Sequence, residues 1–212
     1  MALLLLIRHG HTDVTGVRIP GWAPGIHLSA RGRAQAEALA ARLRGFPLAA
    51  VYASPLERCV ETAEPLARAH GLPVRVRDHL GEVRYGSWTG RSIRQLSRTR
   101  MWRIVQHTPS QVRFPGGETL LEVQERAVGE AERIAAAHPR RPVALVTHGD
   151  VVRLVLAHYA GLHPDLIQRI VVDPVSVSAV ALGDRIPRIL RVNDTGDLAD
   201  LRPGRRRGNV RG

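Results

Sequence analysis

The sequence predicts an α/β protein, a three-layer α/β/α sandwich with a mostly parallel central sheet, an edge hairpin and a helical lid insertion. Apolar runs of strand length alternate along the chain with segments of helical periodicity, which is typical of parallel sheets with right-handed crossovers. The runs 3–7 and 142–147 are apolar throughout, as in strands buried on both faces. A histidine follows each run closely, where open α/β sheets bind ligands.

The first half of the chain gives two strand and helix pairs. Residues 3–7 should form a central strand. A helix is expected over 29–44, with Ser29 as N-cap and Gly45 as the stop. The next strand should span 48–53.

The second helix should begin at Ser54-Pro55-Leu56-Glu57, which has the pattern of a capping box with proline at the first helical position. We expect this helix to run to about His70 and to stop at Gly71. A short third strand is expected over 74–76.

Residues 78–117 differ in character, with more arginine, weaker periodicity and the tryptophans Trp88 and Trp102. We interpret them as an insertion over the edge of the sheet that carries the site. An apolar stripe at helical spacing predicts a helix over 117–137.

The last elements repeat the pattern of the first. A strand is expected over 142–147 and a helix over 150–159. Residues 175–182 and 188–192, separated by Gly183-Asp184, should form an edge hairpin. No internal linker divides the chain, so residues 1–195 are expected to form one domain.

The charge of the chain is concentrated in part at its end. The formal net charge is +12, and residues 202–212 carry five arginines and no acid, which leaves 12 − 5 = +7 for the rest. Glycine and proline among these arginines favour a disordered basic tail over 196–212. The sequence shows no nucleic-acid-binding signature with interleaved aromatics, so no nucleic-acid partner is expected.

The single cysteine, Cys59, excludes an intramolecular disulfide and a metal site built on cysteine clusters. The apolar start of the chain lacks a basic region before it and is cut at strand length by Arg8, unlike a signal peptide. No uncharged run approaches the ~18 residues that a membrane span needs. A cytoplasmic protein without a membrane partner or a cofactor is expected, and a homodimer is the commonest assembly for such a protein.

The residues after the two apolar strands can hold and transfer a phosphoryl group. A neutral imidazole such as His9 can act as a nucleophile and form a phosphohistidine, provided that a backbone carbonyl fixes the tautomer through its other ring nitrogen. Arg8 and Arg58 can grip phosphate oxygens. His148 would add a donor and would hold a proton beside phosphate charge, and Glu82 is the candidate general acid.

The motifs occur in the order of a known family. The chain contains Arg8-His9-Gly10-His11-Thr12, and similar agreement holds for five further segments. These are Leu28-Ser29-x-x-Gly32-x-x-Gln35-Ala36, Ser54-Pro55-Leu56-x-Arg58-x-x-x-Thr62-Ala63, Glu82-x-x-Tyr85-Gly86-x-Trp88-x-Gly90, Pro115-Gly116-Gly117-Glu118 and Val146-Thr147-His148-Gly149. From about residue 3 to 195 the chain thus resembles the histidine phosphatase superfamily, the phosphoglycerate-mutase-like group, branch 1.

The resemblance implies a metal-independent phosphomonoester hydrolase that acts on a small phosphorylated metabolite. It implies His9 as the phosphorylated nucleophile, Glu82 as the proton donor, and a phosphate pocket completed by Arg8, Arg58 and His148. Substrate-binding positions are expected at Thr12, Thr15, Gly21, His11, Arg84 and Gly149.

Two positions depart from the family, which often has Glu where this chain has His11 and Asn where it has Thr15. His11 is expected at the pocket rim. The arginines of the insertion either widen the positive field around the substrate or form a solvated surface. Glu118 either stabilises a helix N-terminus or supports the pocket.

Three alternative functions stay open. A phosphomutase would use the same pocket, but mutases of the family usually have Arg and Leu where this chain has Val83 and Trp88, which favours a phosphatase. The others are a non-catalytic phosphate-binding protein and a nucleic-acid binder that uses the basic tail. Deleting residues 202–212 should abolish any salt-sensitive nucleic-acid affinity that the tail confers.

Overall fold

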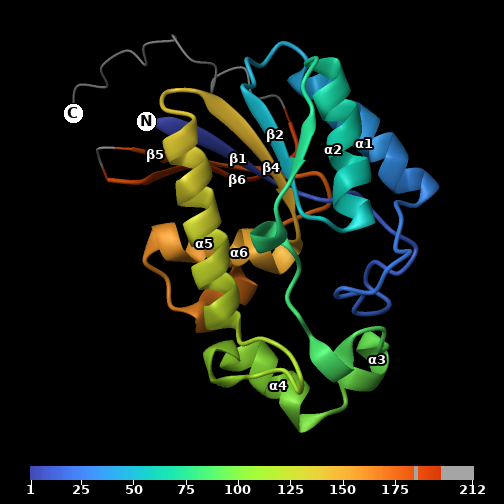
Figure 1. Ribbon diagram of the computed structural model, residues 1–212. Helices are drawn as coiled ribbons and strands as arrows, with labels where there is room; N and C mark the ends of the chain where they lie inside the picture. Colours follow the sequence, from blue (N-terminus) through green and yellow to red (C-terminus); the bar gives the residue numbers. More distant parts are fainter. Residues whose placement is uncertain (184–185, 197–212) are drawn as a thin grey trace.

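The computed structural model describes residues 1–183 and 186–196, in which six strands form one sheet (Figure 1). The strands are β1 (Ala2–Arg8), β2 (Ala50–Ala53), β3 (Val74–Val76), β4 (Pro142–Thr147), β5 (Val177–Leu182) and β6 (Arg188–Asp194). Their order is β3-β2-β4-β1-β5-β6. The first four in this order are parallel to one another, while β5 is antiparallel to both β1 and β6. The mostly parallel sheet is confirmed, and β1 lies inside it as predicted.

Helices cover both faces of the sheet, which confirms the three-layer sandwich (Figure 1). On one face lie α1 (Ala30–Leu43) and α2 (Glu57–Ala69), and on the other lie α5 (Leu120–Ala137) and α6 (Gly149–Ala160). In β1, Leu4 and Leu6 join the core beneath α5 and α6, whereas Leu5 and Ile7 join the core beneath α1 and α2. Because side chains alternate along a strand, one covered on both faces must be apolar at every position.

The helical insertion is present between β3 and α5. It contains α3 (Ile93–Leu96), α4 (Arg100–His107) and 3-10 turns at Asp78–Leu80, Gly86–Trp88 and Pro109–Gln111. In Figure 1 α3 and α4 lie below the sheet, at the end where β4 leads into α6. Another 3-10 turn, Pro164–Arg169, follows α6.

The capping residues predicted from the sequence are correct for one helix and wrong for another. Ser29 caps α1 as predicted, accepting from the Gly32 N–H at 3.1 Å. The capping box predicted at Ser54 is wrong: α2 begins at Glu57, and its cap residue Leu56 makes no side-chain capping bond. The Ser54 hydroxyl accepts from the Leu56 N–H at 3.4 Å and lies closer, at 2.8 Å, to a ring nitrogen of His148 in the site.

The helix α5 begins at Leu120, three residues later than predicted, because Thr119 and Glu122 form a capping box there. The predicted hairpin is confirmed, although only one of its strands, β6, lies at an edge of the sheet, and β3 forms the other edge. Residues 197–212, and with them nearly all of the predicted basic tail, lie outside the described residues. No helix in the described ranges combines the length and apolar character that crossing a bilayer requires.

Candidate active site

His9 follows β1 directly and is held by its backbone and its ring. Its N–H donates to the carbonyl of Thr147 at 2.8 Å, which ties it to the end of β4. Its Nδ1 lies 2.8 Å from the carbonyl of Gly10, the backbone partner that the sequence reasoning required. Since a carbonyl only accepts, Nδ1 carries the proton and Nε2 keeps its lone pair. Burial, followed by the charge of Arg58, lowers the pKa of His9 to about 3, so the ring is neutral at pH 7.

His148 lies beside His9, with ring centroids 5.3 Å apart, and it is fully buried. Its Nδ1 accepts from Nη2 of Arg58 at 3.3 Å, so Nε2 carries the proton and donates to Ser54 at 2.8 Å. Burial, and then the charge of Arg58, hold the pKa of His148 well below its usual range. The prediction that His148 is protonated concerns a site that contains a phosphate dianion, whose charge raises a histidine pKa. It stays a prediction.

Two arginines bring positive charge to the histidines. Arg58, in the first turn of α2, is fully buried and donates from Nη2 to the carbonyl of Gly21 at 2.9 Å. Arg8 donates from Nη1 to the carbonyl of Val172 at 2.7 Å, and burial lowers its pKa. Within the described part of the chain, Nε and Nη1 of Arg58 and Nε of Arg8 are buried without a hydrogen-bond partner. Buried N–H groups of a cation that lack an acceptor are costly, and an anion bonded to them would offset that cost.

Glu82 comes from the insertion and is also buried, with 7% of its surface exposed. Its Oε2 lies 3.5 Å from Nδ1 of His148, and its Oε1 accepts from the Val83 N–H at 3.0 Å. Burial, followed by the charge of Asp150, raises the pKa of Glu82 to about 7. The carboxyl therefore exchanges a proton near neutral pH, which suits a general acid.

The backbone that carries Glu82 is held by residues that the sequence reasoning did not assign to the site. The Glu82 carbonyl accepts from Nε1 of Trp22 at 2.6 Å and from Nη2 of Arg126 at 2.9 Å. Arg126 is in turn held by both carboxylate oxygens of Glu118, at 2.8 and 2.9 Å. Glu118 thus supports the site through Arg126, one of the two roles that the sequence left open. A lone tryptophan in the loop after β1 was the only sequence signal for Trp22, and none marked Arg126.

A cavity of about 360 Å³ is lined by Arg8, His9, Thr12, Thr15, Glu82 and Gly149, among others, whereas Arg58 and His148 are fully buried and do not line it. The hydroxyls of Thr12 and Thr15 lie 2.9 Å apart, and the Thr15 hydroxyl also accepts from the Thr12 N–H at 2.9 Å. Gly21 does not line this cavity but orients Arg58 through its carbonyl.

Besides Gly21, two more predicted substrate contacts, His11 and Arg84, lie outside this cavity. His11 is held at the start of α1, where its Nδ1 is 3.1 Å from the Ser29 hydroxyl. Arg84 is exposed, and its guanidinium stacks 3.9 Å from the centre of the Trp22 ring. The substrate roles expected of His11 and Arg84 remain predictions.

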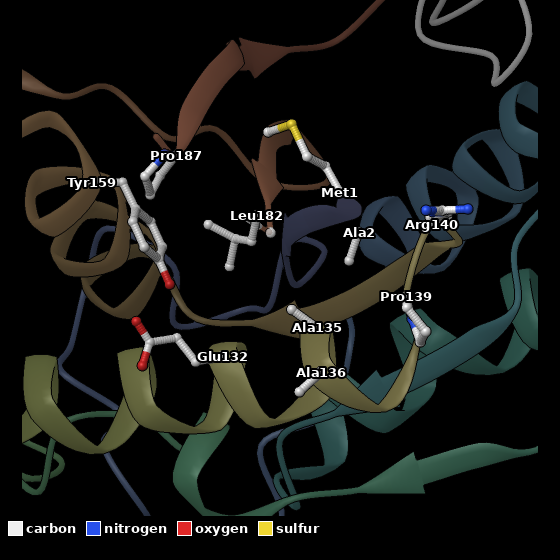
Figure 2. Close-up of a pocket in the computed structure, with 11 residues that line it drawn as sticks. Met1, Ala2, Glu132, Ala135, Ala136, Pro139, Arg140, Tyr159, Leu182 and Pro187 are labelled. Atoms are coloured by element: carbon white, nitrogen blue, oxygen red, sulfur yellow. The ribbon is translucent and has the colours of Figure 1, made fainter. Parts of the chain in front are cut away.

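A larger cavity, of about 710 Å³, lies at the opposite end of the sheet, where β1 begins and β5 ends (Figure 2). Its polar side chains are Glu132, Arg140 and Tyr159, and the Tyr159 hydroxyl points toward Glu132. It lacks a nucleophile beside a general acid and is not the candidate active site. The described residues contain no group of three or more His, Cys, Asp or Glu side chains placed to hold a metal ion.

Known proteins are similar to this chain over most of its length. Phosphoserine phosphatase 1 of Hydrogenobacter thermophilus is 30% identical over 209 residues, covering 95% of this chain and 96% of that protein. The structure of mycobacterial glucosyl-3-phosphoglycerate phosphatase matches with a TM-score of 0.82 and 27% identity, over 91% of this chain and 99% of the other. Bacillus stearothermophilus YhfR matches with a TM-score of 0.86 and 26% identity, over 92% and 98%. A family model described as the histidine phosphatase superfamily (branch 1) matches residues 4–195.

Proposed function

Since this chain belongs to branch 1 of the histidine phosphatase superfamily and is a phosphoric monoester hydrolase, we propose that His9 carries the phosphoryl group between substrate and water. The observation that carries the proposal is the placement of a neutral His9 beside Arg8 and Arg58, whose buried N–H groups lack partners in the described residues. These donors match the oxygens of a phosphate group.

In the first step, the lone pair of Nε2 of His9 attacks phosphorus and the bond from phosphorus to the ester oxygen breaks. Glu82, in its protonated form, gives its proton to the departing oxygen, so an alcohol leaves rather than an alkoxide. Arg8, Arg58 and His148 stabilise the negative charge on the three remaining phosphoryl oxygens.

In the second step, a water molecule attacks phosphorus and gives a proton to the Glu82 carboxylate. The bond from phosphorus to Nε2 breaks, and inorganic phosphate leaves. Both His9 and Glu82 return to their starting forms. The pKa of about 7 suits Glu82 to both roles, because a group acting as acid and then as base works best near the ambient pH.

We propose a small phosphorylated metabolite as the substrate, in keeping with relatives named as phosphatases of phosphoserine and of glucosyl-3-phosphoglycerate. The homodimer and the cytoplasmic location belong to the same proposal. Sedimentation of the purified protein measures the first, and fractionation of cells measures the second.

The experiment is phosphate release from a panel of phosphomonoesters by chelator-treated protein. His9→Ala should lose both turnover and the acid-labile phosphoenzyme, whereas His158→Ala, at an exposed histidine on α6 that does not line the cavity, should retain both. The panel includes 3-phosphoglycerate with 2,3-bisphosphoglycerate, assayed for 2-phosphoglycerate. Isomerisation with little phosphate release would show that the protein is a phosphomutase. No activity in either assay would indicate a non-catalytic phosphate-binding protein.

A further inference from the structure

Much of the lining of the active-site cavity, apart from the phosphate-binding groups, is apolar. This apolar wall is built by the loop after β1 and by the insertion. The side chains that form it are Ile19, Trp88, Ile93, Trp102, Val105 and Phe114. Neither segment forms this wall alone.

The aromatic part of the wall is packed in a fixed arrangement. Trp88 and Trp102 are stacked, with ring centroids 6.0 Å apart and planes 20° apart, and Phe114 meets Trp88 edge to face at 5.3 Å. Trp88 and Phe114 are nearly fully buried, whereas Trp102 is only half-buried and keeps surface that a ligand can cover. A preformed aromatic surface binds a flat apolar group without an ordering cost.

Backbone hydrogen bonds join the two segments of the wall. The Ile19 N–H donates to the carbonyl of Arg91 at 3.0 Å, and the Gly90 N–H donates to the carbonyl of Ile19 at 2.7 Å. The Ile93 N–H donates to the carbonyl of Val17 at 3.0 Å. The loop and the insertion therefore present their apolar side chains as one surface.

The charged groups of the cavity outside the phosphate pocket are already engaged or lie at its mouth. Asp150 pairs with Arg153 at 2.9 Å and accepts from the Tyr85 hydroxyl at 2.7 Å. Arg18 is exposed and donates to the carbonyl of Gly90 at 3.1 Å. A carboxylate on the leaving group that reached Arg153 would lie beside the carboxylate of Asp150, and one that reached Arg18 would lie at an exposed side chain.

Two neutral polar side chains complete the lining. Gln106 and Gln168 are half-buried, and their side-chain amides make no hydrogen bond to another described residue. An amide can donate to or accept from an uncharged polar atom on a ring. At about 360 Å³, the cavity is at the small end of ligand pockets, which suits a phosphate with a compact leaving group.

We infer that the preferred substrates are phosphomonoesters of uncharged alcohols that carry a flat, apolar or aromatic group, and that phosphomonoesters with a carboxylate on the leaving group are poor substrates. This inference rests on the proposed function, and it separates this chain from the relatives named for phosphoserine and glucosyl-3-phosphoglycerate, whose leaving groups carry a carboxylate. It assigns the aromatic wall, and Trp102 in particular, to substrate selection.

The test compares three primary alkyl phosphates, so that the chemistry of the leaving oxygen is matched. These are 2-phenylethyl phosphate, glycerol 1-phosphate and 3-phosphoglycerate. Because apolar pockets discriminate by about 10–200-fold for even one methylene, kcat/KM for the phenylethyl ester should exceed that for each of the others at least tenfold. Equal values, or a preference for 3-phosphoglycerate, would overturn the inference.

Two variants on α4 locate the selectivity. Trp102→Ala, and Trp102→Leu as a milder change, should reduce the phenylethyl-to-glycerol ratio of kcat/KM at least threefold. Met101→Ala is the matched control, because Met101 packs on the core beside Trp102 but does not line the cavity, and its ratio should equal that of the wild type. An unchanged ratio in both Trp102 variants, or an equal reduction in Met101→Ala, would remove Trp102 from substrate selection.

The two proposals fail differently. If no phosphomonoester is turned over, or if His9→Ala retains turnover, the proposed function is wrong. If all three esters are hydrolysed through His9 without a preference for the aromatic one, only the inferred substrate class is wrong. A preference for 3-phosphoglycerate that Arg18→Gln abolishes would show that Arg18 recognises a carboxylate.

Discussion

Replacing Glu82 by glutamine should slow phosphoryl transfer in proportion to how much the leaving oxygen needs a proton. Burial raises the pKa of Glu82 from 4.5 to about 7. At pH 7 about half of the molecules then carry the proton, against about 0.3% at the ordinary value. A shift of this size corresponds to about 3 kcal/mol in favour of the protonated form. In the wild type, Glu82 can therefore donate a proton at neutral pH, whereas a glutamine side chain at this position has no acidic proton to donate.

The assay compares kcat/KM for an alkyl phosphate and for 4-nitrophenyl phosphate. General acid catalysis contributes about 10²–10⁴-fold, so Glu82→Gln should lose at least about a hundredfold with the alkyl ester. The loss with the nitrophenyl ester should be below about tenfold, because nitrophenolate leaves without a proton. In the wild type, kcat/KM for the alkyl ester should fall above about pH 7 as Glu82 ionises, and the variant should lack this fall. Equal losses with both esters would refute Glu82 as the acid.

Three further predictions concern stability and reactivity. Because the pKa of Glu82 is raised in the folded state, the unfolded wild type loses this proton first as pH rises from 4.5 to about 7, and the wild type becomes less stable over that range. Glu82→Gln does not titrate, so its free energy of unfolding relative to the wild type should rise by up to about 3 kcal/mol above pH 7 and should not rise below pH 4.5. Urea unfolding at several pH values measures this, and a constant difference would contradict it. Gly21→Ala should lower the free energy of unfolding more than Gly25→Ala does. Both positions have positive φ, +50° and +73°, where an alanine is strained by about 1–2 kcal/mol, but only at Gly21 would the added Cβ contact another residue, the Thr89 hydroxyl at 2.8 Å. Gly21→Ala alone should also weaken phosphate inhibition, because it displaces the partner of Arg58, and equal effects of the two changes on stability and inhibition would refute this. Burial raises the pKa of the Cys59 thiol to about 12, so Cys59 should react with a disulfide reagent only as fast as the protein unfolds; rapid reaction in the native state would contradict this.

Several parts of the fold were predictable because their cause is local. The strand limits 74–76 and 142–147 were predicted to the residue. For 142–147 the reason is that a strand covered on both faces is a continuous apolar run with clear ends. The short edge strand 74–76, Val-Arg-Val, is half-buried or exposed and lacks that signal. The cap of α1 at Ser29 was predicted because a side-chain hydroxyl bonds to its own helix. The same reasoning failed at Ser54, whose shorter hydrogen bond is to His148, ninety-four residues away.

The sequence determined which chemistry is available. The order of the motifs identified the family, and the positions of His9 and His148 after two strands predicted that they share one end of the sheet. The parallel register brings them there, because β1 pairs with β4 and the two strands end together at Arg8 and Thr147. The roles proposed for the site residues rest on this placement and are tested by the variants above.

Only the tertiary structure decided how the candidate groups are tuned and what surrounds them. The pKa values of His9 and Glu82 depend on how deeply each is buried and on which charges lie nearby, and neither is written in a local pattern. The support of Glu82 by Trp22 and Arg126 joins three distant segments, and the aromatic wall joins the loop after β1 to the insertion. A local pattern records the residues that chemistry requires, but desolvation, charge and shape arise only when distant segments pack together.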